Sequence, residues 1–140
     1  MKISTKGRYA LRFMLDMAQN TADGSLASLG DVAKRQDISP KYLEQIVSIL
    51  VRAGYVTGMR GASGGYRLTK APSAYTVGQI LRLTEGELSP ADCTSEFGCP
   101  RGGGCPAEAF WRGLYNCITD YVDNCTLADL IAQCQEKRDN

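Results

Sequence analysis

Apolar residues recur at intervals of three and four positions in three successive stretches of the first half of the chain, which begin at Leu11, Leu29 and Leu43. This spacing places the apolar side chains on one face of a helix. A hydroxyl residue that can cap a helix precedes each stretch, and Pro40 occupies the first position of the third. Gly54 provides a suitable C-terminal stop. The pattern predicts three helices, the last two separated by a tight turn.

A short hairpin follows the third helix. Residues 55–60 and 66–69 read as two strands, and the glycine-rich segment 61–65 supplies the turn between them. A basic hairpin directly after three helices is typical of the wing of a winged helix-turn-helix domain. We therefore expect a mainly α fold with a small β-hairpin wing (55–69), inside a DNA-binding domain that spans residues 1–85.

Helical periodicity returns in the second half of the chain, on both sides of a loop at 86–108. A capping-box pattern at Thr76 opens the helix before this loop. After the loop, apolar residues form a seam that predicts a C-terminal dimerisation helix: Trp111, Leu114, Ile118, Val122 and Cys125. Residues 109–134 then hold this helix and a short terminal helix, and residues 135–140 are expected to form a flexible tail.

Charge divides the chain in a way that the net charge of +1 conceals. Residues 1–70 carry 11 Lys and Arg against 5 Asp and Glu, whereas residues 71–140 carry 5 against 10. A basic half favours a polyanionic partner such as double-stranded DNA. Four basic residues near the start of the first helix could meet phosphates: Lys2, Lys6, Arg8 and Arg12. No apolar run approaches the length of a membrane span, so we expect no membrane association and a cytoplasmic location.

The third helix carries polar side chains opposite its apolar stripe: Lys41, Glu44, Gln45, Ser48 and Arg52. As the second helix of a helix-turn-helix, it can enter the major groove of DNA. Gln45 could pair with adenine, and Glu44 could accept a hydrogen bond from the cytosine amino group. Arg60, at the tip of the wing, suits a narrow and electronegative minor groove. The alternatives are an ordinary solvated helix face and a plain surface hairpin.

All six cysteines lie after residue 92, and three of them recur at a six-residue step in a segment rich in glycine and proline: Cys93, Cys99 and Cys105. Soft thiolates on such a segment suit an iron–sulfur cluster or another thiophilic metal. Zinc fits less well, because structural zinc sites favour ligands about two to four residues apart. A thiol-redox switch is the other alternative. Of the remaining cysteines, Cys117 and Cys125 are expected to be buried, and Cys134 could be either exposed or buried.

Three motifs together carry a family resemblance. They are KISTKGRYALRFMLDMA at residues 2–18, YLEQ at 42–45 and RGASGGY at 60–66. They are similar to the winged-helix transcription regulators that include IscR, NsrR and CymR. The resemblance implies a homodimeric regulator, usually a repressor, that binds a palindromic operator. It places Tyr42, Glu44 and Gln45 at the major groove and Arg60 in the minor groove. The full set of expected DNA contacts is Lys41, Tyr42, Glu44, Gln45, Ser48, Arg60 and Gly61.

The same resemblance implies that Cys93, Cys99 and Cys105 bind an iron–sulfur cluster, which would sense iron–sulfur status, redox or nitric oxide. It favours [2Fe–2S], although [4Fe–4S] fits the same spacing. IscR supplies a histidine three residues after its third cysteine, and Glu108 takes that position here. The fourth ligand could be Glu108, another cysteine or an acidic side chain elsewhere in the dimer.

The alternative within the family is a cluster-free, CymR-like repressor, controlled by a partner protein or by thiol oxidation. An enzyme is disfavoured on the sequence itself. The chain has no histidine and no phosphate-binding glycine motif after a strand.

Overall fold

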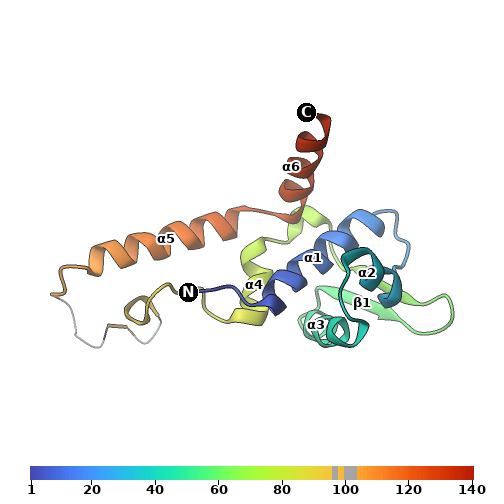
Figure 1. Cartoon of the computed structure of the whole chain (residues 1–140), viewed down its shortest axis with the longest axis horizontal. Coiled ribbons are helices and arrows are strands. Elements are labelled where there is room, and N and C mark those ends of the chain that lie inside the picture. Colours follow the sequence, from blue (N-terminus) through green and yellow to red (C-terminus); the bar gives the residue numbers. More distant parts are fainter. Residues whose placement is uncertain (96–97, 100–103) are drawn as a thin grey trace.

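The computed structural model describes residues 1–95, 98–99 and 104–140. Its elements run in chain order as α1 (Thr5–Asn20), α2 (Leu29–Gln36), α3 (Pro40–Arg52), β1 (Val56–Met59), β2 (Gly65–Leu68), η1 (Pro72–Ala74), α4 (Val77–Glu85), η2 (Asp92–Thr94), α5 (Glu108–Asn124) and α6 (Leu127–Asp139). Figure 1 shows α1 to α4 and the hairpin gathered in one body, from which α5 extends to one side and α6 projects. The predicted mainly α fold with a β-hairpin wing is confirmed.

Side-chain caps begin the helices where the sequence predicts them. Ser28 accepts a hydrogen bond from the backbone of Asp31 at 3.1 Å, and Ser39 accepts one from the backbone of Tyr42 at 3.2 Å. Thr76 forms a complete capping box with Gln79. Each cap satisfies amide groups that the first turn of a helix leaves unpaired. The turn between α2 and α3 passes through Asp37, which has a left-handed backbone with φ of 53°.

The wing is a two-stranded antiparallel sheet in which Val56 pairs with Leu68 and Met59 pairs with Gly65. Tyr66 also exchanges backbone hydrogen bonds with Ala27, at 2.8 and 2.9 Å, which ties the hairpin to the segment before α2. The base of the hairpin is fixed by the fully buried Tyr75. Its hydroxyl donates to the carbonyl of Tyr55 at 2.8 Å and accepts from the backbone of Lys70 at 2.9 Å.

The main core surrounds α1, whose Phe13, Met14 and Met17 are fully buried. The apolar face of α3, Ile80 of α4 and Leu127 at the start of α6 all join this core. A second, smaller core contains Val77, Leu81 and Leu88, and α5 packs against it. The helix-turn-helix and the wing are therefore held on one continuous scaffold.

The position of α5 corrects the predicted dimerisation seam. Ile118, Val122 and Cys125 pack against the second core of their own chain, so most of the seam faces α4 rather than a partner. The face left open is a different one, and its large apolar residues include Phe110, 64% exposed, and Tyr121, 72% exposed. Periodicity alone could not distinguish the two faces, because both recur at helical intervals.

The expectation for Cys117 is also wrong. Cys117 was expected to be buried, but it lies on the open side of α5 and is exposed, whereas Cys125 is half-buried. The expected flexible tail at 135–140 is helical as far as Asp139. Lys137 and Arg138 lie in the last turn of α6, where their positive charges interact favourably with the helix dipole. Within the described part of the chain, no helix is long and apolar enough to cross a membrane.

Candidate nucleic-acid interface and cysteine loop

The polar face of α3 is open to solvent, as the sequence predicts. Leu43, Ile46 and Leu50 are buried in the core, so the opposite side of the helix must point outward. Lys41, Glu44, Gln45 and Ser48 are exposed and line a shallow hollow of about 480 Å³ together with Arg52. This surface combines hydrogen-bond donors and acceptors with two positive charges.

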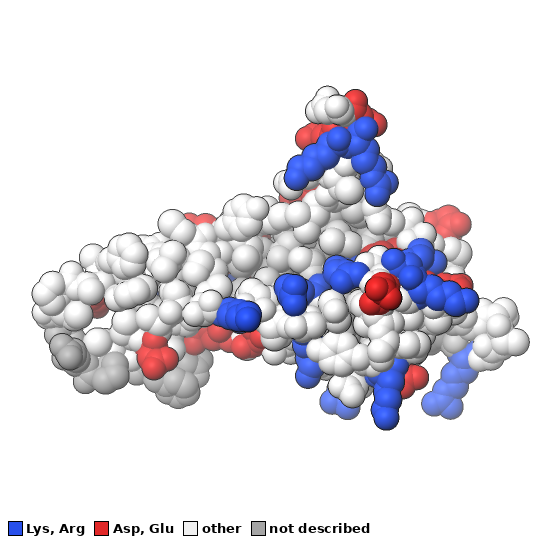
Figure 2. Space-filling view, viewed as in Figure 1, with Lys and Arg blue, Asp and Glu red and all other residues white. Residues whose placement is uncertain are grey.

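A second hollow joins α3 to the wing. It has a volume of about 700 Å³, and its walls include Glu44 and Ser48 from α3 and Arg60 and Gly61 from the hairpin. The structure therefore brings the predicted major-groove and minor-groove residues to one side of the molecule. Figure 2 shows lysine and arginine side chains projecting along the edge of the body below α3 and the wing. A basic face that combines a helix and a hairpin matches the geometry of winged-helix DNA readers.

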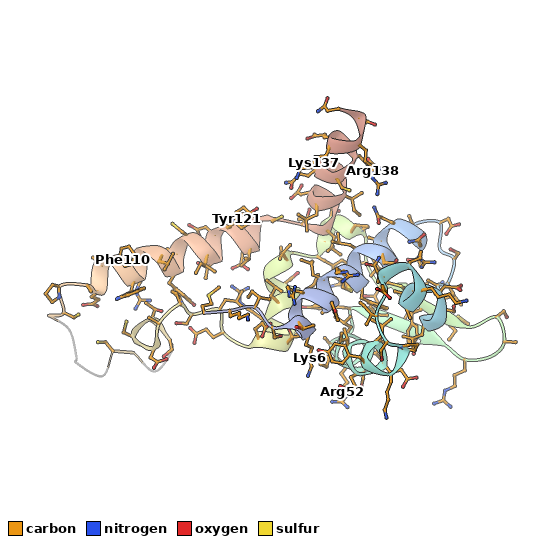
Figure 3. The ribbon with its side chains drawn as sticks, viewed as in Figure 1. Lys6, Arg52, Phe110, Tyr121, Lys137 and Arg138 are labelled. Carbon is orange, nitrogen blue, oxygen red and sulfur yellow. The ribbon has the colours of Figure 1, made fainter. Side chains whose placement is uncertain are left out.

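Arg52 also borders both hollows and was not among the predicted DNA contacts. It lies four residues after Ser48, and residues at this spacing share one helix face. The spacing alone could therefore have identified Arg52 as a DNA contact. Figure 3 shows Arg52 at the outer edge of the domain, below α3 in that view.

Tyr42 is half-buried at the start of α3, and α1 supports it. Its ring packs edge-on against Tyr9, with the ring centres 5.8 Å apart. Arg12 lies over the other ring of this pair, with its guanidinium carbon 5.1 Å from the centre of Tyr9. Arg12 also donates to the side-chain oxygen of Gln36 at 3.1 Å and to the Gln36 carbonyl. The guanidinium of Arg12 thus links α1 to the end of α2, and its expected contact with phosphate stays a prediction.

A buried carboxylate anchors α2 to α1 beside this contact. Asp16 is 2% exposed and accepts two hydrogen bonds from Arg35, at 2.7 and 3.0 Å, and one from Gln36 at 2.9 Å. These hydrogen bonds raise the pKa of Arg35 above its usual value. Because a buried charge is costly unless it is paired, this network fixes the position of α2 and of the turn that leads into α3.

The cysteine loop begins against α5. Cys93 is half-buried in η2, which packs against α5. The hydroxyl groups of Ser89 and Thr94 lie 2.6 Å apart and fix the start of this turn. Cys99 and Cys105 are also half-buried, and each follows a glycine with a left-handed backbone. The remaining residues of the loop, 96–97 and 100–103, lie outside the described part of the chain.

The structure does not gather the predicted cluster ligands. Among residues 1–95, 98–99 and 104–140, no group of three or more cysteine, histidine, aspartate or glutamate side chains lies close enough to hold a metal ion. Cys93, Cys99 and Cys105 are free thiols, and Glu108 is exposed at the start of α5. The donor set fits an iron–sulfur cluster in its chemistry, since three thiols lie on one short segment. Binding would require these thiols to converge.

Comparison with known proteins identifies the family of the chain. Residues 3–133 match the Rrf2 family model, described as iron-dependent transcriptional regulator. The chain is 39% identical over 131 residues to the HTH-type transcriptional regulator IscR of Erwinia tasmaniensis, and the match covers 94% of this chain and 79% of that protein. These similar proteins are regulators rather than enzymes.

Two solved structures are similar to the fold. CymR, the global cysteine regulator of B. subtilis, matches with a TM-score of 0.79 and 38% identity, over 95% of this chain and 98% of that one. T. potens IscR matches with a TM-score of 0.79 and 34% identity, over 98% of this chain and 90% of that one. The family match covers nearly the whole chain, including the helix-turn-helix, the wing and α5. The chain therefore belongs to the Rrf2 family of transcription regulators.

Proposed function

We propose that the chain is a homodimeric repressor that binds a palindromic operator and responds to a cluster held by its cysteine loop. The observation that carries this proposal is the common outer face of α3 and the wing, where Glu44, Ser48, Arg60 and Gly61 border one hollow. Such a regulator would act in the cytoplasm, where its DNA lies.

On the DNA, each element has a separate task. Gln45 and Glu44 read base edges in the major groove, while Lys41 and Ser48 bind the flanking backbone. Tyr42, held by Tyr9, contacts the DNA at the start of α3. Arg60 and Gly61 enter the adjacent minor groove, because the glycine allows the tip of the hairpin to approach closely. We add Arg52 to this set as a phosphate contact.

The open face of α5 is the proposed dimer interface. Phe110, Leu114, Cys117 and Tyr121 recur at intervals of four, three and four residues, and all four are exposed in the single chain. Figure 3 shows Phe110 and Tyr121 on the same side of α5, away from the body. An exposed apolar helix face is typical of a protein–protein interface. The same face on a second copy of the chain can bury it in a symmetric dimer.

We assign Cys93, Cys99 and Cys105 as cluster ligands, with Glu108 as the candidate fourth ligand. When bound, an iron–sulfur cluster supplies a centre that reacts with oxidants and nitric oxide. The chain contributes three thiols, and Cys93 lies in a turn that contacts α5. This contact gives the loop a mechanical connection to the proposed dimer helix. A [2Fe–2S] cluster is favoured over [4Fe–4S].

Anaerobic purification tests this assignment. We expect iron, acid-labile sulfide and visible absorption in the intact protein, and loss of all three in the Cys93→Ala/Cys99→Ala/Cys105→Ala variant. Cys134→Ala is the matched control, since Cys134 is exposed on α6 and remote in sequence from the loop. A colourless protein with stoichiometric zinc would contradict the cluster while leaving DNA binding intact.

A cluster-free repressor is the second candidate, and two observations favour it. The fold is as similar to CymR as to T. potens IscR, and the described cysteines are not gathered around a metal position. Control would then come from a partner protein or from oxidation of the partly exposed thiols. Operator binding that is unchanged in the triple alanine variant under anaerobic conditions, but altered by a partner protein, would favour this candidate.

A further inference from the structure

The joint between α4 and α5 has an unusually close approach at Gly78. This glycine lies in the first turn of α4, and a methyl group added to it would overlap the Asp123 carboxylate of α5. The same methyl group would lie 2.8 Å from Nη1 of Arg82 and 3.1 Å from a methyl carbon of Val122. A side chain at this position would therefore displace the Asp123 carboxylate and the Arg82 guanidinium from their present positions.

An ion pair fixes the direction of α5 at the same place. Arg82 of α4 donates to both carboxylate oxygens of Asp123, at 2.5 and 3.0 Å. These hydrogen bonds raise the pKa of Arg82 above its usual value. A two-pronged contact between guanidinium and carboxylate restricts orientation as well as distance, which a single contact does not.

Backbone contacts hold the end of α5 next to this pair. The amide of Val77 donates to the carbonyl of Cys125 at 2.8 Å, and the amide of Leu127 donates to the carbonyl of Tyr75 at 3.1 Å. Leu127 itself is fully buried in the main core. The C-terminal end of α5 is therefore a fixed pivot, and Figure 1 shows the rest of the helix extending away from it.

We propose that Gly78 and the Arg82–Asp123 pair set the direction of α5 relative to α3, and thereby determine the spacing between operator half-sites. They are positioning residues, which act through α5. The inference rests on the dimer of the proposed function, in which the open face of α5 meets a second copy. Because α4 packs on α1 and α1 packs on α3, a change of angle at the joint moves the recognition helix relative to the dimer axis.

Because α5 is long, a small change of angle at the joint produces a large displacement at the far end of the helix. Phe110 lies 13 residues before Asp123 along α5, which corresponds to about 20 Å of helix. A tilt of about 10° at the pivot displaces the far end by roughly 3.5 Å, which is close to the rise of one base pair. Symmetry applies the displacement in both protomers, so a small tilt changes the preferred spacing by about one or two base pairs.

Selection of operators with variable spacers tests the proposal. We expect Gly78→Ala and Arg82→Ala to change the preferred spacer by at least about one base pair, with an affinity ratio between old and new spacings of about tenfold, while affinity for an isolated half-site is unchanged. The exchange variant Arg82→Asp/Asp123→Arg should restore the original spacing. Gly30→Ala is the control, since Gly30 lies in α2, away from the joint, and a methyl group there meets nothing within 4 Å.

The outcomes separate this inference from the proposed function. Dimeric variants that keep the original spacer preference would overturn the role of the joint alone. An intact chain that sediments as a monomer with operator bound would overturn the proposed dimer and the joint together. Arg82→Ala keeps the test valid if Gly78→Ala fails to fold, because the Arg82 and Asp123 side chains are 35% and 42% exposed and lie outside the core.

Discussion

The DNA-reading body and α5 differ in how many of their residues are buried and hydrogen-bonded within one chain. In the body, α1 has seven buried residues, and the buried charge of Asp16 is fully hydrogen-bonded. In α5, whose 17 residues are all described, none is buried, and the helix begins without a side-chain cap. A helix with so little burial gains little stability from its own domain. The difference is the one expected if the proposed dimer completes the packing of α5, while the body is already complete within one chain.

The body should therefore be the more sensitive to a change in its polar interior. We expect Asp16→Ala to lower the free energy of unfolding by about 3 kcal/mol, because it leaves Arg35 and Gln36 without their shared acceptor. Denaturant unfolding measures this change. Asp23→Ala is a suitable control, since Asp23 is exposed in the turn after α1. Equal stabilities of the two variants would show that the Asp16 network does not hold the body together.

A charge on the open face of α5 should separate the protomers and leave the body folded. We expect Tyr121→Glu to weaken the dimer by about 100-fold, since an unpaired carboxylate would be buried at the interface. Sedimentation velocity measures the mass, and thermal unfolding checks the body. The matched control, Asn116→Glu, places the same charge on a different, polar side of α5. Dimers of equal strength in both variants would exclude this face as the interface.

Removal of the wing arginine should affect DNA binding alone. We expect Arg60→Ala to weaken operator binding by about 2 kcal/mol, with no change in stability, because Arg60 is exposed and extends from the tip of the hairpin. Titration at fixed salt concentration measures this loss. Glu44→Ala should instead change the preferred sequence more than the overall affinity. An equal effect of Glu44→Ala on every sequence would argue against base recognition by this residue.

The smallest expected effect concerns Cys125, at the corner between α5 and α6. Burial, and then the negative charge of Asp129, raise the pKa of its thiol above the usual value. A raised pKa means that less thiolate is present near pH 8, so we expect alkylation of Cys125 to be several-fold slower than that of exposed Cys134. The rate should rise as the pH approaches the raised pKa. Mass spectrometry of alkylated peptides measures both rates, and equal rates in the folded protein would contradict the packing of this corner.

The sequence predicts the body well because its signals are local. Ser28, Ser39 and Thr76 cap the helices that their spacing indicates, and the glycine-rich turn produces the wing. The exposed face of α3 follows directly from the buried positions of its apolar stripe. These features depend on residues a few positions apart, so periodicity and capping chemistry are sufficient.

The sequence does not predict which of two possible surfaces a residue contacts. α5 carries two apolar faces roughly 90° apart on the helix, with Leu114 near their boundary, and periodicity cannot show which one α4 covers. The hydrogen bond between Arg12 and Gln36 was missed for a related reason, because the two residues are 24 positions apart. The cysteine spacing identifies soft ligands, but whether they converge depends on the fold of the whole loop.

In the proposed regulator, chemistry at the cysteine loop changes how a dimer binds its operator. The most direct test is anaerobic titration of operator with the protein as purified and after iron removal by a chelator, at one salt concentration, with sedimentation of both samples. We expect iron removal to change the affinity by at least about tenfold while both forms remain dimeric. Equal affinities, or a protein that contains no iron when purified, would contradict the claim.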